Sequence, residues 1–140
     1  MSETRNTQMV KDAYAAFLRG DVTTVLSMLD DSVQWEGAKG GEGVVPTSGL
    51  RRGRAAVGEF FSQLAANIDF DLFEPQEYVA QGDMVVAIGK YAGKARPTGR
   101  AMSGDWAMVF NFRDGKITRF REFSDSAMAV RAFSPAAVTA

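Results

Sequence analysis

The hydrophobic pattern of this chain changes its period once, near Ile68, and that change limits the fold more than any other feature. Before Ile68, apolar residues recur at intervals of three and four, which is the spacing of one buried helix face. After it, apolar and polar residues alternate, as they do in strands with one buried face. Helices followed by a run of strands are typical of an α+β domain.

Three helices are predicted before the change of period. The first has its apolar face over residues 9–18 and ends at Gly20, after which Asp21 is a suitable N-cap for a second helix over 22–29. The third helix is expected over residues 54–67, where apolar residues again share one face.

A short strand and a long loop are predicted between the second and third helices. Residues 33–36 alternate as a strand does. Residues 37–53 contain many glycines and a proline, too many breakers for a regular element, so we interpret this segment as a loop over the scaffold. Its Lys39–Gly43 stretch lacks the flanking strand and helix that a phosphate-binding loop requires.

Four long strands are predicted after the change of period, over residues 69–80, 84–95, 102–112 and 116–123. Gly82-Asp83 and Asp114-Gly115 are typical hairpin turns. A short helix is expected over 124–133 and a frayed tail over 134–140, and no linker divides the single domain of residues 1–140. We expect a strongly curved antiparallel or mixed sheet around the helices, forming a cone with an internal hydrophobic pocket.

The amino-acid composition limits the kinds of chemistry that the chain can perform. The chain has no cysteine and no histidine, which excludes disulfides, thiol nucleophiles, histidine-based triads and the usual zinc and haem sites. Acid–base chemistry must therefore come from carboxylates, tyrosine, lysine or water, and we expect no cofactor and no metal. The 16 basic and 17 acidic residues include no basic run, so neither nucleic acid nor a membrane is an expected partner. Because no apolar stretch spans a bilayer and the N-terminus lacks a signal-peptide pattern, we expect a cytoplasmic protein.

Several motifs, taken in their order and spacing, resemble the SnoaL-like branch of the ketosteroid isomerase and nuclear transport factor superfamily, which has a cystatin-like fold. They are Tyr14–Asp21, Met28–Glu36, Leu50–Val57 and Pro97–Arg100, followed by residues 110–125 with the pattern F-x-F-x-x-G-K-I-x-x-F-R-E-F-x-D. The resemblance covers nearly the whole chain and implies the same curved cone. The superfamily includes isomerases, cyclases, epoxide hydrolases, dehydratases and non-catalytic binders, so the resemblance does not fix the activity.

The resemblance places two carboxylates at catalytic positions. Glu36 stands where ketosteroid isomerases have the general base that moves a proton beside a carbonyl, a task for a carboxylate in a partly dry pocket. Asp125 matches an aspartate of the epoxide hydrolase-like enzymes and the acid–base residue proposed for SnoaL-like cyclases. The alternatives are a solvated strand-end carboxylate for Glu36 and an N-cap of the following helix for Asp125.

Eight further residues are predicted to line the pocket. They are Tyr14, Phe17, Trp35, Phe61, Tyr91, Trp106, Met108 and Glu122. Trp106 and Tyr91 combine a large apolar area with one hydrogen-bond donor, and Tyr14 resembles the oxyanion-hole tyrosine of the isomerases. The alternatives are ordinary core packing for the aromatic residues and a cross-strand ion pair with an arginine for Glu122, and the second of these is our preferred interpretation of Glu122.

Two departures from the family patterns shape the functional prediction. Met108 stands where the isomerases have their second oxyanion donor, and Gly89 and Tyr91 stand where the epoxide hydrolases have an arginine and an aspartate. We predict a cofactor-free acid–base enzyme of the isomerase or cyclase type, acting on a hydrophobic small molecule with a carbonyl group through Asp125 or Glu36. The alternative is a non-catalytic ligand-binding or dimerising domain of the same fold. A homodimer through the outer sheet face is also expected.

Overall fold

The computed structural model describes residues 2–135, which form four helices and one six-stranded sheet. In chain order the elements are α1 (Glu3–Leu18), α2 (Val22–Ser27), β1 (Leu29–Gly37), β2 (Gly49–Arg52), α3 (Arg54–Asn67), β3 (Ile68–Gln81), β4 (Met84–Ala95), β5 (Arg100–Arg113), β6 (Lys116–Ser124) and α4 (Ser126–Phe133). The predicted α+β class is confirmed. The tail predicted over 134–140 lies outside the described residues from position 136 onward.

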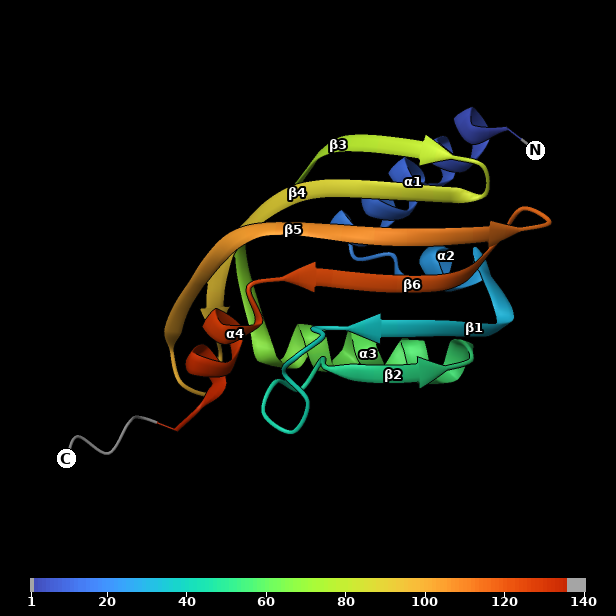
Figure 1. Cartoon of the computed structure of the whole chain (residues 1–140). Helices are drawn as coiled ribbons and strands as arrows, with labels where there is room; N and C mark the ends of the chain where they lie inside the picture. Colours follow the sequence, from blue (N-terminus) through green and yellow to red (C-terminus); the bar gives the residue numbers. More distant parts are fainter. Residues whose placement is uncertain (1, 136–140) are drawn as a thin grey trace.

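The sheet has the strand order β2-β1-β6-β5-β4-β3. Every neighbouring pair is antiparallel except β1 and β6, which run parallel, so the sheet is mixed. Two register shifts in β3, after Phe70 and after Pro75, are irregularities of the kind that bend a strand. Figure 1 shows the consequence, because β3, β4 and β5 curve strongly and α1, α2 and α3 lie behind the sheet on its concave side. The predicted curved sheet around three helices is therefore confirmed.

The boundaries of the N-terminal elements differ from the prediction at one place. Asp21 caps α2 as expected, with its carboxylate accepting a hydrogen bond of 3.1 Å from the backbone N–H of Thr24. The helix ends at Ser27 rather than continuing to Leu29. Leu29 instead begins β1, where it is fully buried and pairs with Ile117 of β6.

The segment predicted as one long loop contains a strand. Residues 49–52 form β2, which pairs antiparallel with β1 at the edge of the sheet. The prediction of a loop is therefore wrong for these four residues. The two ends of the remaining loop, residues 38–48, are joined because the Ser48 hydroxyl donates to the Ala38 carbonyl at 2.6 Å.

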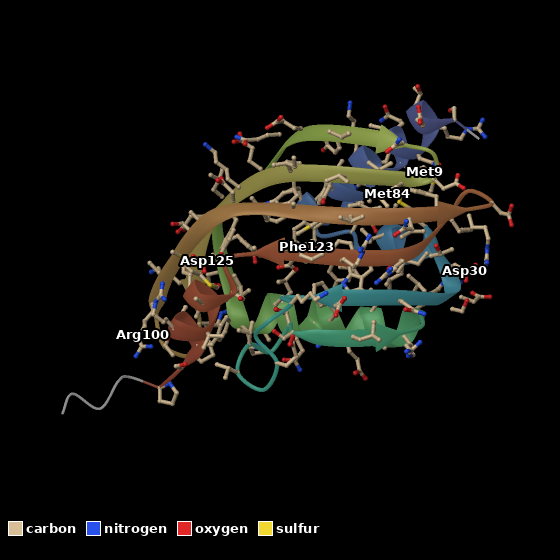
Figure 2. All side chains as sticks on the ribbon, in the orientation of Figure 1. Met9, Asp30, Met84, Arg100, Phe123 and Asp125 are labelled. Carbon is tan, nitrogen blue, oxygen red and sulfur yellow. The ribbon has the colours of Figure 1, made fainter. Side chains whose placement is uncertain are left out.

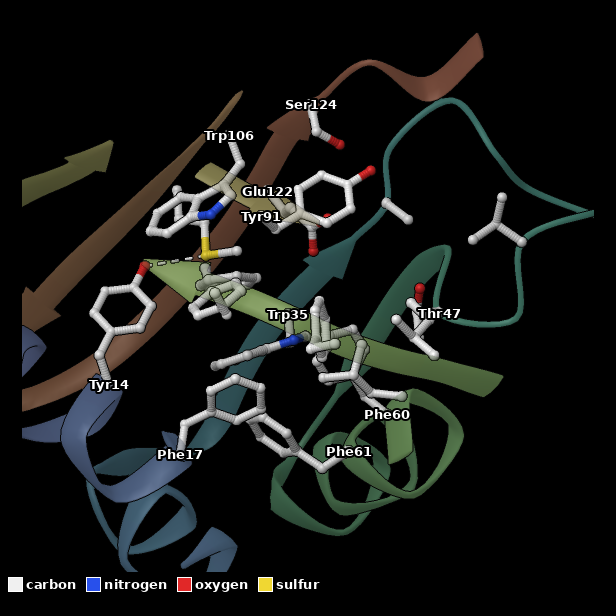
Figure 3. Close-up of a pocket in the computed structure, with 18 of the residues that line it drawn as sticks. Tyr14, Phe17, Trp35, Thr47, Phe60, Phe61, Tyr91, Trp106, Glu122 and Ser124 are labelled. Carbon is white, nitrogen blue, oxygen red and sulfur yellow. Dashed lines mark hydrogen bonds between the residues drawn. The ribbon is translucent and has the colours of Figure 1, made fainter. Parts of the chain in front are cut away.

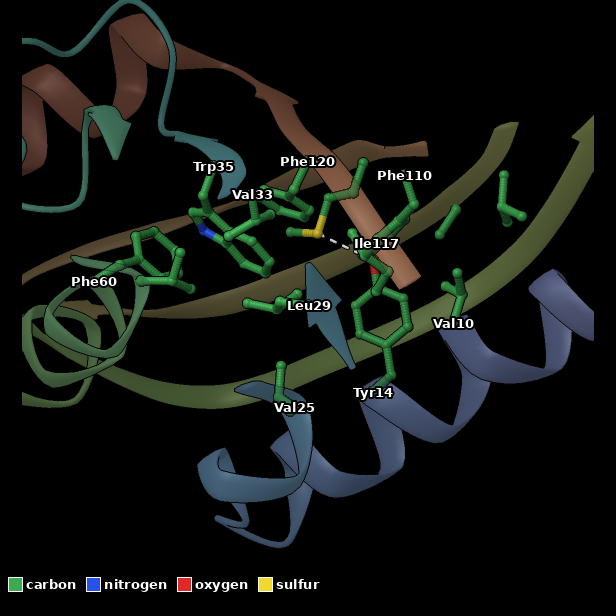
Figure 4. Packing of buried hydrophobic residues seen from close by; sticks show 14 of the residues in the cluster. Val10, Tyr14, Val25, Leu29, Val33, Trp35, Phe60, Phe110, Ile117 and Phe120 are labelled. Carbon is green, nitrogen blue, oxygen red and sulfur yellow. Dashed lines mark hydrogen bonds between the residues drawn. The ribbon is translucent and has the colours of Figure 1, made fainter. Parts of the chain in front are cut away.

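The hydrophobic core fills the space between the helices and the concave face of the sheet (Figure 4). Val10 and Val57 from the helices and Val33 from β1 are fully buried in it. A second, smaller cluster lies under α4 and includes Met102 and Phe133. Within residues 2–135, no helix is both long and apolar enough to cross a membrane.

Candidate ligand-binding and catalytic site

A cavity of about 110 Å³ lies inside the cone. Its wall is formed by side chains from α1, α3, α4, the concave face of the sheet and the loop between β1 and β2 (Figure 3). All eight residues predicted to line a pocket do line it, and the wall is mostly aromatic and aliphatic. The apolar lining with few polar groups is typical of small-molecule sites, and the volume is below the usual range of about 300–1,000 Å³.

Glu122 is the acidic residue of the described chain that lines the cavity. It lies on β6 directly opposite Met108 of β5. Burial raises the pKa of Glu122 from 4.5 to about 7, and the backbone N–H of Ala38 opposes this rise by favouring the carboxylate. A carboxyl group with this pKa is present in both the protonated and the ionised form near neutral pH, as acid–base catalysis requires.

The preferred interpretation of Glu122 as half of an ion pair is wrong. No ion pair between described residues includes Glu122. The neighbouring Arg121 projects to the other face of β6, because successive side chains on a strand alternate between faces. Glu122 therefore faces the cavity without a cation, which is why desolvation dominates its pKa.

Glu36 does not line the cavity. Its neighbour Trp35 points inward and is buried, so Glu36 projects from the outer face of β1. There its carboxylate lies 3.9 Å from the Lys39 ammonium, with 27% of the Glu36 side chain exposed. The prediction that Glu36 lies inside the pocket is wrong. The alternative prediction, a solvated carboxylate at the end of a strand, agrees with its position.

Asp125 is also outside the cavity wall. It is exposed, and its carboxylate accepts a hydrogen bond of 3.1 Å from the backbone N–H of Met128 at the start of α4. The predicted alternative of an N-cap is confirmed. The expected place of Asp125 inside the pocket is wrong, because the cap directs its carboxylate back onto the helix.

Tyr14 and Tyr91 contribute two hydroxyl groups to the cavity wall. The Tyr14 hydroxyl donates to the Met108 sulfur at 3.0 Å, and burial raises the pKa of Tyr14 well above 10.0. Burial also raises the pKa of Tyr91, and the nearby carboxylates of Glu122 and Asp125 raise it further. Both phenols are therefore neutral near neutral pH, and Tyr91 is a hydrogen-bond donor close to Glu122.

The cavity wall includes residues beyond the eight predicted ones, and three of these come from a loop or from the end of an element. Thr47 is 3% exposed and comes from the loop between β1 and β2, Ser124 ends β6, and Phe133 ends α4. The apolar spacing of Ala129 and Phe133 on the last helix was the one available signal. Together they place α4 and the loop at the cavity wall.

The described residues contain no group of three His, Cys, Asp or Glu side chains that could hold a metal ion. The polar groups that the cavity wall itself provides are the Glu122 carboxyl, the tyrosine hydroxyls, the hydroxyls of Thr47 and Ser124, and the indoles of Trp35 and Trp106.

Comparison with known proteins gives the family. Residues 10–120 match the family model of the SnoaL-like domain. The chain belongs to the SnoaL-like family. No similar sequence is found among the curated proteins.

Solved structures similar to this SnoaL-like protein share nearly its full length. An NTF2-like protein of Burkholderia xenovorans LB400 is 32% identical with a TM-score of 0.85, over 96% of this chain and 99% of its own. TerC, crystallised with polyporic acid, is 25% identical with a TM-score of 0.74, over 92% of this chain and 98% of its own. A candidate polyketide cyclase of Xanthomonas campestris pv. campestris is 24% identical with a TM-score of 0.77, over 95% of this chain and 100% of its own, and supports the fold alone.

Proposed function

We propose that this SnoaL-like protein binds a hydrophobic small molecule with a carbonyl group and moves a proton on it, with Glu122 as the acid–base residue and without a cofactor. One observation carries the proposal. Glu122 lies in an apolar cavity without an ion-pair partner among the described residues, and its pKa is about 7. This combination suits proton transfer at neutral pH better than it suits stability.

The proposed reaction is proton transfer beside a carbonyl, as in isomerases and cyclases. The ionised Glu122 removes a proton from the activated carbon and returns it at the same or another atom. Tyr91 is neutral and adjacent, so its hydroxyl is the group available to donate to the oxygen that becomes negative. TerC, which is 25% identical over nearly the full length, was crystallised with polyporic acid, and this supports a small-molecule ligand.

Hydrogen–deuterium exchange tests the proposal without knowledge of the natural substrate. The rate at which 2-tetralone exchanges the protons beside its carbonyl in D₂O is measured by NMR with and without protein. We expect the protein to accelerate exchange and Glu122→Gln to lower the rate about 10²–10⁴-fold, the usual contribution of general acid–base catalysis.

The control is Glu36→Gln, the same substitution on the outer sheet face, which should leave the exchange rate unchanged. Equal rates for the wild type and Glu122→Gln would contradict the proposed role of Glu122.

A second candidate is a ligand-binding protein without catalysis. The observation that favours it is the hydrogen bond from the Tyr14 hydroxyl to the Met108 sulfur. Because the hydroxyl proton is used in this bond, it is not available to a reacting oxygen. This candidate predicts ligand binding with no acceleration of exchange.

We also propose that the protein forms a homodimer through the outer face of the sheet. Phe123 on β6 and Leu50 on β2 are 39% and 48% exposed, and Figure 2 shows Phe123 on the uncovered face. Val79 of β3 is 59% exposed at the far side of the same sheet. Exposed apolar side chains on one face are typical of a surface that a second copy covers.

A further inference from the structure

Two buried indole N–H groups in the cavity wall have no hydrogen-bond partner within residues 2–135. Trp35 and Trp106 are 4% and 3% exposed, and among the described residues neither Nε1 atom finds an acceptor. Both residues line the cavity, and Figure 3 shows their nitrogens among its lining side chains. Buried donors without partners are rare because they lose hydration without compensation, so each needs an explanation.

The Trp106 ring is fixed in its place. Phe73 stacks on it with ring centroids 5.0 Å apart and the planes 10° from parallel. Gly89 lies opposite Trp106 on the neighbouring strand β4. The Trp106 ring occupies the space where a side chain at position 89 would lie, since a Cβ there would overlap Trp106 Cζ2 and the Glu74 carbonyl. The indole therefore cannot swing away to find a partner for its N–H.

The Trp35 ring is fixed in the same way. It stacks on Phe120 at 3.9 Å with an angle of 16°, and Phe60 packs edge-on against it at 5.5 Å. The two indoles come from β1 and β5, which are separated by β6 in the sheet. The two indoles therefore belong to separate parts of the cavity wall.

We propose that the Trp35 and Trp106 N–H groups are two fixed donors that select a flat aromatic ligand with two acceptor oxygens, such as a quinone or an aromatic diketone. The flat shape follows from the stacked rings of the wall, and the two oxygens follow from two donors on different strands. This inference deepens the proposed function and rests on its small-molecule ligand.

Calorimetric titration with a matched pair of probes tests the proposal. 1,4-Naphthoquinone offers two carbonyl oxygens, whereas naphthalene has the same fused rings and no acceptor. The chain has no cysteine, so the quinone meets no thiol with which to react. The variants Trp35→Phe and Trp106→Phe remove each donor and keep an aromatic ring, and Phe61→Leu is the control that changes the wall and leaves both donors.

We expect the wild type to bind naphthoquinone more tightly than naphthalene. Each Trp→Phe change should weaken naphthoquinone binding about 3- to 10-fold, the usual contribution of one hydrogen bond, and leave naphthalene binding nearly unchanged. Phe61→Leu should weaken both probes alike. Naphthalene binding by the variants also shows that their cavities remain folded.

The proposal is overturned if the wild type shows no preference for the quinone, or if both probes lose affinity equally in the Trp→Phe variants. Selective loss of quinone affinity without accelerated proton exchange would support these donors and refute the acid–base function. Accelerated exchange with unchanged quinone affinity in both Trp→Phe variants would support the acid–base function and refute the role of the two indole donors.

Discussion

The burial of Glu122 makes the stability of the folded protein depend on pH. Its pKa is about 7 in the folded state against an ordinary value of 4.5, because the cavity withholds water from the carboxylate. A group whose folded pKa is raised binds its proton more tightly in the folded chain than in the unfolded chain. Its contribution is therefore fully present below pH 4.5 and is lost as the pH rises through about 7.

The size of this loss follows from the pKa difference. A rise from 4.5 to about 7 corresponds to about 3 kcal/mol, at 1.36 kcal/mol for each pKa unit. Between pH 5 and pH 8 the folded protein passes from the mostly protonated to the mostly ionised form of Glu122, so we expect a loss of about 2–3 kcal/mol over this range. Tyr14 and Tyr91 stay neutral in this range because burial raises the pKa of each.

Urea unfolding at pH 5, 6, 7 and 8 measures the loss. Glu122→Gln keeps the shape of the side chain and cannot ionise. The free energy of unfolding of this variant, minus that of the wild type, should therefore increase by about 2–3 kcal/mol from pH 5 to pH 8. Glu36→Gln on the outer face should follow the wild-type curve. If the wild type and Glu122→Gln give parallel curves from pH 5 to pH 8, Glu122 ionises as in water and the reasoning fails.

Two further changes test other parts of the structure. Gly89→Ala should destabilise the protein by about 1–3 kcal/mol in urea, because its Cβ would overlap Trp106 and the β3 backbone. Its control, Gly58→Ala, meets Leu26 at an ordinary 3.7 Å and should be neutral or stabilising. Phe123→Asp should convert a dimer into a monomer by light scattering, whereas an aspartate at Leu18, 57% exposed on α1, should not. A monomeric wild type would contradict the dimer.

The long hairpins could be predicted because their signals are local. β5 alternates between buried and more exposed residues, β4 is rich in β-branched and other apolar residues, and the turn residues adopt the backbone conformation that the turns need. Asp114 and Gly115 have φ values of 51° and 76°, in the left-handed region that a tight hairpin turn requires. Sequence neighbours alone determine such a turn, so the prediction holds.

The strand β2 could not be predicted in this way. It has only four residues, and its place at the edge of the sheet comes from pairing with β1, which the chain reaches after an eleven-residue loop. The start of β1 was missed for a related reason. Leu29 continues the apolar spacing of α2, and only its pairing with β6 makes it part of a strand.

The family resemblance predicts the wrong carboxylates for the cavity, because it does not take the alternation of side chains along a strand into account. If Trp35 points into the core, Glu36 must point out, and the period of two alone excludes Glu36 from the cavity. The same rule applied from Phe120 puts Glu122 inside, as the structure shows. What the sequence does not reveal is whether an arginine reaches the buried carboxylate, because that depends on the packing of the whole sheet.

Unpaired buried atoms do not mark a site by themselves. Asn6 on α1 is 1% exposed and both ends of its amide lack partners among the described residues, yet it lies away from the cavity wall. Trp35 and Trp106 differ because both border one cavity, and each indole also stacks on a neighbouring ring. Apolar residues of similar volume at these positions would give a more stable fold. Their presence together is therefore better explained by a ligand that satisfies them than by the needs of the core.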